Sequence, residues 1–232
     1  MTSQLSIAKR VVVTCGIAVF TSIVSFAQSS EMAAKAQQFG ASAKANAQAL
    51  RMYTWQMRVE VTFKGDAKPA KLYQMTFDAD GKVQKTLLTP AAPPEPPSRG
   101  LKGRIKEKKV AEMKEWAGDL ADLCKGYLAP SPALLNAFFA KVMTVQAPGG
   151  FVQMYAEGVI VPGDKLVYEV DPKTQAVNRV LFNTTLEGDP VDGTVQITSV
   201  PGGGPSHAAQ VTVNAPKKKI TATINNLNYV RQ

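Results

Sequence analysis

The chain is poor in cysteine, histidine and aromatic residues. Its 232 residues include two cysteines, Cys15 and Cys124, and one histidine, His207, and aromatic residues make up 7%. A zinc site usually needs more than one imidazole or thiolate, and a Ser-His-acid triad would have to use His207. This histidine follows a glycine-rich turn, so we expect it to be a solvated loop residue. We therefore expect a non-enzymatic protein with no catalytic residue, no metal and no cofactor.

The first 27 residues have the features of a secretory signal peptide. Lys9 and Arg10 precede an apolar stretch, residues 11–26, that is short for a membrane span. Small residues, Ser25 and Ala27, occupy the positions that a signal peptidase needs before its cleavage site. We therefore expect cleavage after Ala27 and a periplasmic or secreted mature protein.

The mature chain, residues 28–232, is expected to form one domain without a disulfide. Cys15 leaves with the signal peptide, and it lies too early in the apolar stretch to be a lipidation site. Cys124 is then the only cysteine, and we interpret it as a small core residue on a helix. The formal net charge of +9 falls to +7 without Lys9 and Arg10. Positive charge outside the cytoplasm favours anionic lipid, lipopolysaccharide or acidic protein as partners, or else it serves solubility without any partner. The low aromatic content argues against nucleic acid.

Residues 53–63 alternate without exception between apolar and polar side chains. This period of two predicts a β-strand of roughly 36 Å, at about 3.3 Å per residue, with one apolar and one solvated face. The apolar positions are Tyr53, Trp55, Met57, Val59, Val61 and Phe63. A strand of this length is typical of a large one-sided sheet, and whatever covers or occupies its apolar side is where function is expected.

Two more strands are predicted in the first half of the chain. Residues 71–78 alternate, and the turn Asp78–Gly81 leads into a third strand at 82–89. The turn has some likeness to a calcium-binding loop, but a third acidic ligand is missing, so we interpret it as a hairpin turn.

Helices are predicted on both sides of these strands. An Ala-, Lys- and Gln-rich segment, 29–52, predicts an N-terminal helix with a thin apolar stripe. Five prolines make residues 90–100 an extended spacer. Residues 101–145 then predict a two-helix insertion, whose second helix has Ser131 as N-cap and Pro132 as first helical residue.

From Gly150 onward, alternating segments return one after another, separated by turn residues. Successive strands on short turns predict an antiparallel meander with one hydrophobic face. We therefore expect an α+β fold. It consists of a curved antiparallel sheet of about nine strands, forming an open half-barrel. The N-terminal helix covers it, and the insertion folds back over it as a lid.

This order of elements behind a signal peptide resembles the periplasmic lipoprotein-carrier superfamily of LolA and LolB type. The turn segments Tyr155–Asp164 and Thr185–Val191 also resemble uncharacterised bacterial secreted proteins of similar layout. The likeness extends over nearly the whole mature chain, but it concerns element order and turn chemistry, so no functional residue is carried over. It implies an unclosed barrel in which a helical lid encloses an apolar cavity for acyl chains. The missing lipobox sets the chain apart from the lipidated receptor type.

These inferences predict a binding protein that takes a lipid or another hydrophobic ligand under the lid. The candidate lining residues are Trp55, Met57, Tyr73, Met75, Phe138 and Phe139. The alternative is a protein-interaction or stress-sensing module of the cell envelope with a filled core and no ligand. The sequence does not distinguish a filled interior from a cavity.

A basic run opens the first helix of the insertion. Its candidate residues for contact with an anionic surface are Lys102, Arg104, Lys106, Lys108 and Lys109. Cations at a helix start oppose the helix dipole, so they do not cap the helix. They are explained equally well by contact with an anionic membrane or an envelope protein and by a solvated linker.

Overall fold

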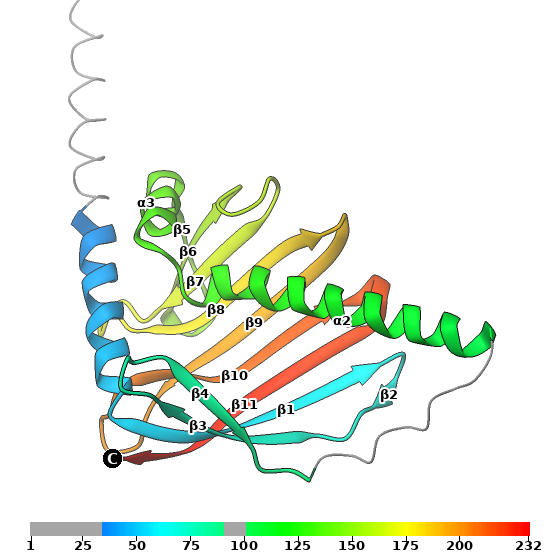
Figure 1. Cartoon of the computed structure of the whole chain (residues 1–232). Helices are drawn as coiled ribbons and strands as arrows, with labels where there is room; N and C mark the ends of the chain where they lie inside the picture. Colours follow the sequence, from blue (N-terminus) through cyan, green and yellow to red (C-terminus); the bar gives the residue numbers. More distant parts are fainter. Residues whose placement is uncertain (1–33, 91–100) are drawn as a thin grey trace, which may run out of the picture.

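The computed structural model describes residues 34–90 and 101–232, with residues 101–107, 109 and 110 described as backbone only. The predicted signal peptide and nearly all of the proline-rich spacer lie outside the described residues. In the described part, one curved sheet forms the body of the molecule and helices pack across one side of it (Figure 1).

Eleven antiparallel strands form this sheet in the described chain. In chain order they are β1 (Tyr53–Phe63), β2 (Asp66–Ala67), β3 (Lys71–Phe77), β4 (Val83–Leu87), β5 (Met143–Gln146), β6 (Val152–Glu157), β7 (Lys165–Val170), β8 (Val177–Leu186), β9 (Asp189–Ser199), β10 (Ser206–Ala215) and β11 (Ile220–Arg231). Across the sheet the order is β4-β3-β1-β11-β10-β9-β8-β7-β6-β5, with β2 paired to β1.

The edge strands β4 and β5 do not pair with each other, so the sheet is an open half-barrel. The predicted α+β fold is confirmed. The sheet has two strands more than the nine or so expected, and its shortest strands are β2, with two residues, and the edge strand β5, with four.

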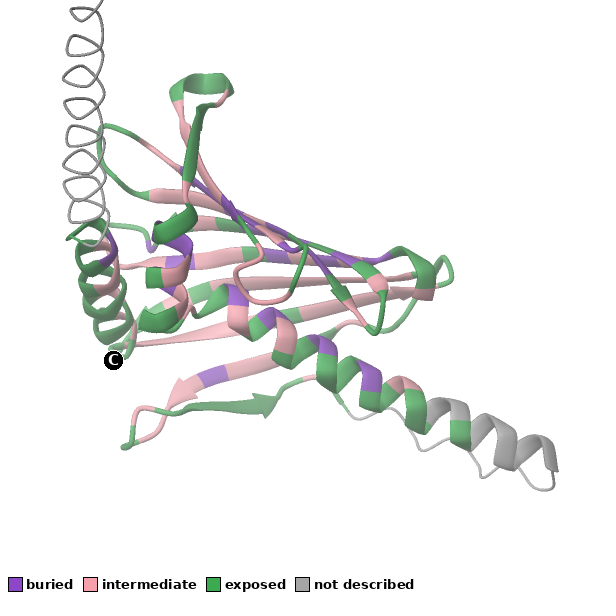
Figure 2. Cartoon of the chain, turned by 90° about the horizontal axis from the view of Figure 1, so that it is seen from above, coloured by how far each residue is buried: buried purple, intermediate pink, exposed green. Residues whose placement is uncertain are grey.

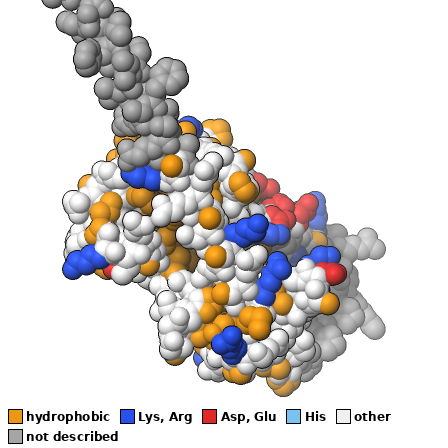
Figure 3. Space-filling view, turned by 90° about the vertical axis from the view of Figure 1, so that its left-hand side faces the viewer, with side chains coloured by type: hydrophobic (Ala, Val, Ile, Leu, Met, Phe, Trp, Pro, Cys, Tyr) orange, Lys and Arg blue, Asp and Glu red, His pale blue; other side chains and the backbone are white. Residues whose placement is uncertain are grey.

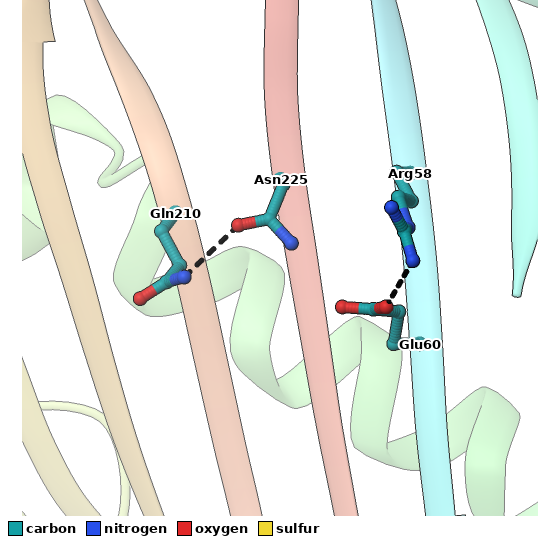
Figure 4. Close-up of polar contacts among 4 residues, drawn as sticks. All are labelled: Arg58, Glu60, Gln210 and Asn225. Atoms are coloured by element: carbon teal, nitrogen blue, oxygen red, sulfur yellow. Dashed lines mark hydrogen bonds and ion pairs between the residues drawn. The ribbon is translucent and has the colours of Figure 1, made fainter. Parts of the chain in front are cut away.

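Strand β1 joins the first strands of the chain to the last. It pairs with β3 on one side, where Trp55 lies opposite Met75, and with β11 on the other, where Val59 lies opposite Ile224. The alternation of β1 is confirmed: its apolar residues face the side on which the helices pack, the inner face. Arg58 and Glu60 lie on the opposite, outer face (Figure 4).

Three helices are described on the inner side of the sheet (Figures 1 and 2): an N-terminal helix over residues 34–50, α2 (Leu101–Leu128) and α3 (Pro132–Lys141). The predicted start of α3 is confirmed, because the Ser131 Oγ accepts a hydrogen bond from the Leu134 N–H at 3.2 Å. Within the described segments, no helix is long and apolar enough to cross a membrane.

The hydrophobic core lies between these helices and strands β6 to β10. Helix α2 contributes buried residues at spacings of three and four, namely Trp116, Leu120, Cys124 and Tyr127. The prediction for Cys124 is confirmed: its side chain is in the core, and burial raises the pKa of its thiol to about 11. A thiol with this pKa stays protonated and unreactive near neutral pH.

The prediction that His207 is a solvated loop residue is wrong. The turn ends at Pro205, whose carbonyl accepts a hydrogen bond from the Val200 N–H at 3.0 Å, and β10 begins at Ser206. His207 is therefore a strand residue and is only 9% exposed. The glycines suggested a longer loop than the one that forms, because the six residues from Val200 to Pro205 suffice to reverse the chain between β9 and β10.

The interpretation of Asp78–Gly81 as a hairpin turn is confirmed. The Asp78 carboxylate accepts hydrogen bonds from the N–H groups of Asp80 at 3.0 Å and Lys82 at 2.8 Å. Gly81 has a φ of 75°, in the left-handed region that glycine adopts without strain. The turn uses its carboxylate to hold its own backbone.

Candidate functional site

The inner face of the sheet is covered unevenly. Over β6 to β10 the apolar side chains are buried under α2, α3 and the N-terminal helix, and Leu166, Phe182 and Val191 have no exposed area. Phe39 of the N-terminal helix packs its ring 5.3 Å from Tyr168, measured between centroids, and 5.9 Å from Phe139. This part of the interior is filled with side chains.

Over β1 and β3 the inner face is covered much less. Trp55, Met57 and Tyr73 are half-buried, and Met75, at 6% exposure, is the one fully buried residue of these two strands. None of the described residues of β1 or β3 belongs to the core cluster. We call Trp55, Met57, Tyr73 and Met75 the β1–β3 apolar surface.

Four of the six predicted lining residues are thus brought together. Cross-strand pairing places Trp55 opposite Met75 and Met57 opposite Tyr73, so all four lie on one face of two adjacent strands. The sequence could predict this because the alternation of both segments was regular.

The other two predicted lining residues lie elsewhere. Phe138 and Phe139 are 0% and 5% exposed and form edge contacts within the core, Phe138 with the ring of Tyr168 at 5.0 Å. They belong to the filled part of the interior, and a ligand would meet them only if the helices moved away from the sheet.

An aromatic cluster closes one end of the β1–β3 apolar surface. The Trp55 ring stacks on Tyr229 at 5.6 Å and lies 5.5 Å from Phe77, and the Tyr229 ring lies 4.0 Å from that of His207. Asn226 fixes the indole: its Oδ1 accepts a hydrogen bond from Trp55 Nε1 at 3.1 Å, and its Nδ2 donates to the Ala208 carbonyl at 2.8 Å. No sequence pattern indicates Tyr229 or Asn226, since their contact with Trp55 depends on the β1–β11 pairing.

His207 is held neutral in this cluster. Burial lowers the pKa of its imidazole, and the Pro205 backbone opposes the shift only in part. Its Nδ1 is buried without a hydrogen-bond partner among the described residues. Burial raises the pKa of the neighbouring Tyr229 hydroxyl, so that side chain is also neutral.

Helix α2 is anchored near its C-terminal end by a buried carboxylate. Asp164, with no exposed area, accepts hydrogen bonds from the Tyr127 hydroxyl at 2.7 Å and from the N–H groups of Val159, Ile160 and Val161 at 2.7 to 3.1 Å. Burial is the largest effect on its pKa and opposes ionisation, but these donors together hold the pKa below its usual range. From the sequence, this segment is predicted only as a turn.

The predicted basic run lies on the N-terminal part of α2. Lys108 is exposed and lies 3.9 Å from the Glu112 carboxylate. The side chains of Lys102, Arg104, Lys106 and Lys109 lie outside the described side chains, so their role stays a prediction.

The outer face differs between the two halves of the sheet. Over β10, β11 and β1 it is polar: Gln210 donates to Asn225 at 2.9 Å, and Arg58 pairs with Glu60 at 2.7 Å (Figure 4). Over β5 to β8 it carries an open hollow of about 380 Å³. The hollow is lined by Val145, Gln153, Tyr155, Lys165, Val167, Leu181 and Asn183.

A second hollow, of about 420 Å³, lies beside the first and is more polar. Its lining includes Phe151, Gln196 and the ion pair between Arg179 and Glu169, which measures 2.7 Å. The Gln153 amide donates a hydrogen bond to the same carboxylate at 3.2 Å. Since Glu169 is already paired, this hollow presents little net charge to a ligand.

Hydrophobic side chains also reach the surface at the edges of the sheet. Val83 and Leu87 of β4 are 51% and 42% exposed, and Met143 and Val145 of β5 are both 49% exposed. Figure 3, which shows the end of the molecule that lies on the left in Figure 1, has exposed hydrophobic side chains between single lysines and arginines. Among the described residues, no group of three His, Cys, Asp or Glu is placed to hold a metal ion.

Comparison with known proteins gives two similar solved structures. No family model matches the chain, and no curated protein matches it. A DUF1329 family protein from Desulfovibrio piger shares 11% identity over 82% of this chain and 92% of its own, with a TM-score of 0.41. A LolA superfamily protein from Nitrosomonas europaea shares 9% identity over 82% of this chain and 93% of its own, with a TM-score of 0.36. The second has the superfamily name to which the element order pointed, and likeness at this level indicates neither a ligand nor a partner.

Proposed function

We propose that this chain is a non-enzymatic binding protein that holds a lipid or another hydrophobic molecule between the β1–β3 apolar surface and helix α2. The observation that carries the proposal is the uneven cover of the inner face. The β6–β10 half is filled by side chains, while Trp55, Met57 and Tyr73 stay half-buried. Apolar side chains left partly open on an otherwise covered face are typical of ligand sites.

The same surface supplies both affinity and orientation. Covering each 100 Å² of apolar surface contributes about 2.5 kcal/mol before the costs of ordering the ligand. The cluster of Trp55, Tyr229 and His207 closes one end with rigid rings, and neutral groups there suit an uncharged part of a ligand. A long apolar molecule along β1, with one end against this cluster, fits these features.

We also propose that the protein works outside the cytoplasm. The predicted signal peptide, residues 1–27, supports export, and the single cysteine of the mature chain is buried and does not depend on an oxidising compartment. Cleavage after Ala27 is checked by N-terminal sequencing or intact mass of the exported protein.

Binding of a fluorescent fatty acid to two neighbouring variants tests the proposed site. Met57→Gln places an amide on the inner face and should weaken binding by about tenfold or more, the cost of burying a polar group without a partner. Arg58→Gln introduces the same residue one position further along β1, on the outer face, and should leave binding unchanged. Equal effects of the two substitutions, or no binding by the unmodified protein, would contradict the proposal.

A second function is favoured by a different observation. The edge strand β5 has no charged residue, and its exposed Met143 and Val145 lie beside the apolar lining of the outer hollow. Unprotected edge strands pair readily with strands of other proteins, so a protein-interaction module of the cell envelope is the alternative. Val145→Lys should abolish retention of an envelope partner if this alternative holds, and should leave fatty-acid binding unchanged if the carrier proposal holds.

A further inference from the structure

Two turns that carry lysines meet at the end of the sheet where β1 ends, the right-hand end in Figure 1, and a third turn, which has no lysine, is bound to them. The Lys64 N–H donates to the Lys219 carbonyl at 2.8 Å, which joins the turn after β1 to the turn between β10 and β11. Lys217 Nζ donates to the Gly188 carbonyl at 3.2 Å, which adds the turn between β8 and β9. We call the lysines of these turns, Lys64, Lys68, Lys217, Lys218 and Lys219, the lysine rim.

The lysine rim continues onto helix α2. The Lys218 Nζ lies 5.6 Å from the centre of the Trp116 ring, so the middle of α2 lies beside these turns. From Trp116 toward its N-terminus, the helix leads to the exposed Lys108. Two segments far apart in the chain, the rim turns and this part of α2, thus both bring lysines whose side chains are described to one end of the molecule.

The positive charge of the rim is only partly neutralised. Asp189 lies 3.2 Å from Lys217 and 3.7 Å from Lys218, so one carboxylate serves two lysines. Lys64, Lys68 and Lys219 are exposed, and no ion pair holds any of them within the described part of the chain. Asp66 and Glu187 are the other acids of these turns, which leaves lysines in excess.

Apolar surface reaches the same end. The ring of Phe63, the last inner residue of β1, has Lys64 Nζ at 5.1 Å and Lys68 Nζ at 6.0 Å from its centre. Lysines around a half-buried aromatic residue suit the boundary between water and lipid, because their long stems lie along apolar surface while the ammonium groups stay in water. Lysine also acts as a point charge without the bidentate geometry with which arginine recognises one carboxylate.

We propose that the lysine rim docks this protein on an anionic membrane face. In that orientation, the end of β1 and the N-terminal part of α2 lie against the bilayer. The inference rests on the proposed function, because it names the membrane from which a hydrophobic ligand passes onto the β1–β3 apolar surface. Phe63, at the membrane end of β1, continues the line of apolar residues that leads inward to Met57 and Trp55.

Two matched triple variants test the docking by co-sedimentation with phosphatidylcholine vesicles, with and without phosphatidylglycerol. Lys64→Gln, Lys68→Gln and Lys219→Gln remove three rim charges. Lys44→Gln, Lys82→Gln and Lys173→Gln remove three exposed charges from the opposite end of the molecule, one on the N-terminal helix and two in the β3–β4 and β7–β8 turns, so net charge falls equally.

The unmodified protein should bind only the vesicles that contain phosphatidylglycerol. Each lysine near an anionic bilayer strengthens binding about fivefold, so the rim variant should bind on the order of a hundredfold more weakly at low salt. The control variant should stay within a few-fold of the unmodified protein. Equal loss of vesicle binding in both variants, or no loss in either, overturns the inference. Binding of an acidic protein through the rim lysines, without binding of any vesicle, also overturns it.

Fatty-acid binding measured on the same three proteins without vesicles keeps the two proposals apart. If all three proteins bind the fatty acid but vesicle binding does not depend on the rim lysines, the docking inference is wrong and the carrier proposal is still supported. If vesicle binding depends on the rim lysines but none of the three proteins binds the fatty acid, the carrier proposal is wrong and the docking inference is still supported.

Discussion

At the scale of single residues, Gly193 of β9 leaves no room for a side chain beside Phe182 of β8. The two residues are cross-strand partners, and a Cβ at position 193 would overlap the Phe182 ring. That ring in turn stacks on Tyr127 of α2, with centroids 4.5 Å apart. The absence of a side chain at position 193 therefore allows α2 to pack against the sheet.

Gly193→Ala should lower the free energy of unfolding by about 1–3 kcal/mol, because the ring must leave its stacked position. Combined with Phe182→Leu, the alanine should cost much less than it does alone, since the smaller side chain makes room for it. Urea unfolding of the two single variants and the double variant measures this coupling. Strictly additive losses would mean that the ring is not what the glycine accommodates.

His207 gives the protein a pH-dependent stability. Its folded-state pKa lies below its usual value of 6.5, so the unfolded chain takes up the proton first as the pH falls. The stabilising contribution of the neutral imidazole is complete above about pH 6.5 and is lost as the pH drops through the folded-state pKa. Tyr229, its ring neighbour, does not titrate in this range.

The unmodified protein should therefore become less stable between pH 7 and pH 5, in the pH range where histidine titrates. His207→Phe should remove this part of the pH dependence, which urea unfolding at several pH values measures. Parallel stability curves for the two proteins would show that the imidazole does not titrate differently in the folded and unfolded states.

At the scale of elements, the position of α2 depends on the hydrogen bonds of Asp164. The Tyr127 hydroxyl bridges that carboxylate at 2.7 Å and the Thr184 hydroxyl at 2.9 Å, so one side chain of α2 joins the β6–β7 turn to β8. A charged acceptor with three backbone donors fixes the turn itself, and the tyrosine attaches the helix to it.

Tyr127→Phe should lower the free energy of unfolding by about 1–2 kcal/mol and speed amide exchange in the last turns of α2. Asp164→Asn should cost about 2–4 kcal/mol, because the backbone N–H groups of the turn then lose their charged acceptor. Urea unfolding of both variants checks which loss is larger, and hydrogen exchange checks whether the last turns of α2 open in each. Faster exchange in α2 of the asparagine variant alone would mean that the tyrosine does not anchor the helix.

The elements themselves could largely be predicted from the sequence, while their long-range pairing could not. Alternation in residues 53–63 predicted β1 and its inner face, and Ser131 with Pro132 predicted the start of α3. The pairing of β1 with β11 joins residues more than 150 positions apart, as in the hydrogen bond between Trp55 and Asn226, and no local pattern encodes it. The wrong prediction for His207 came from a local pattern instead, because the glycines before it suggested a long loop where a tight turn forms.

At the scale of the whole molecule, the chain is an open half-barrel with one filled half and one half that is partly open. Phe138 and Phe139, as apolar as Trp55 and Met57 in sequence, lie in the filled half because α3 packs on β6. The sequence pattern placed all four residues on apolar faces. It could not tell the filled half from the partly open half, since this difference depends on where the three helices pack on the sheet.

Native mass spectrometry of the protein, purified without detergent, shows whether a hydrophobic ligand occupies the β1–β3 apolar surface. We predict a species heavier than the bare chain by the mass of one acyl-chain lipid or similar molecule. Organic extraction should remove the additional mass, and Met57→Gln should reduce it. A bare chain mass, together with no binding of an environment-sensitive hydrophobic dye, would contradict the account.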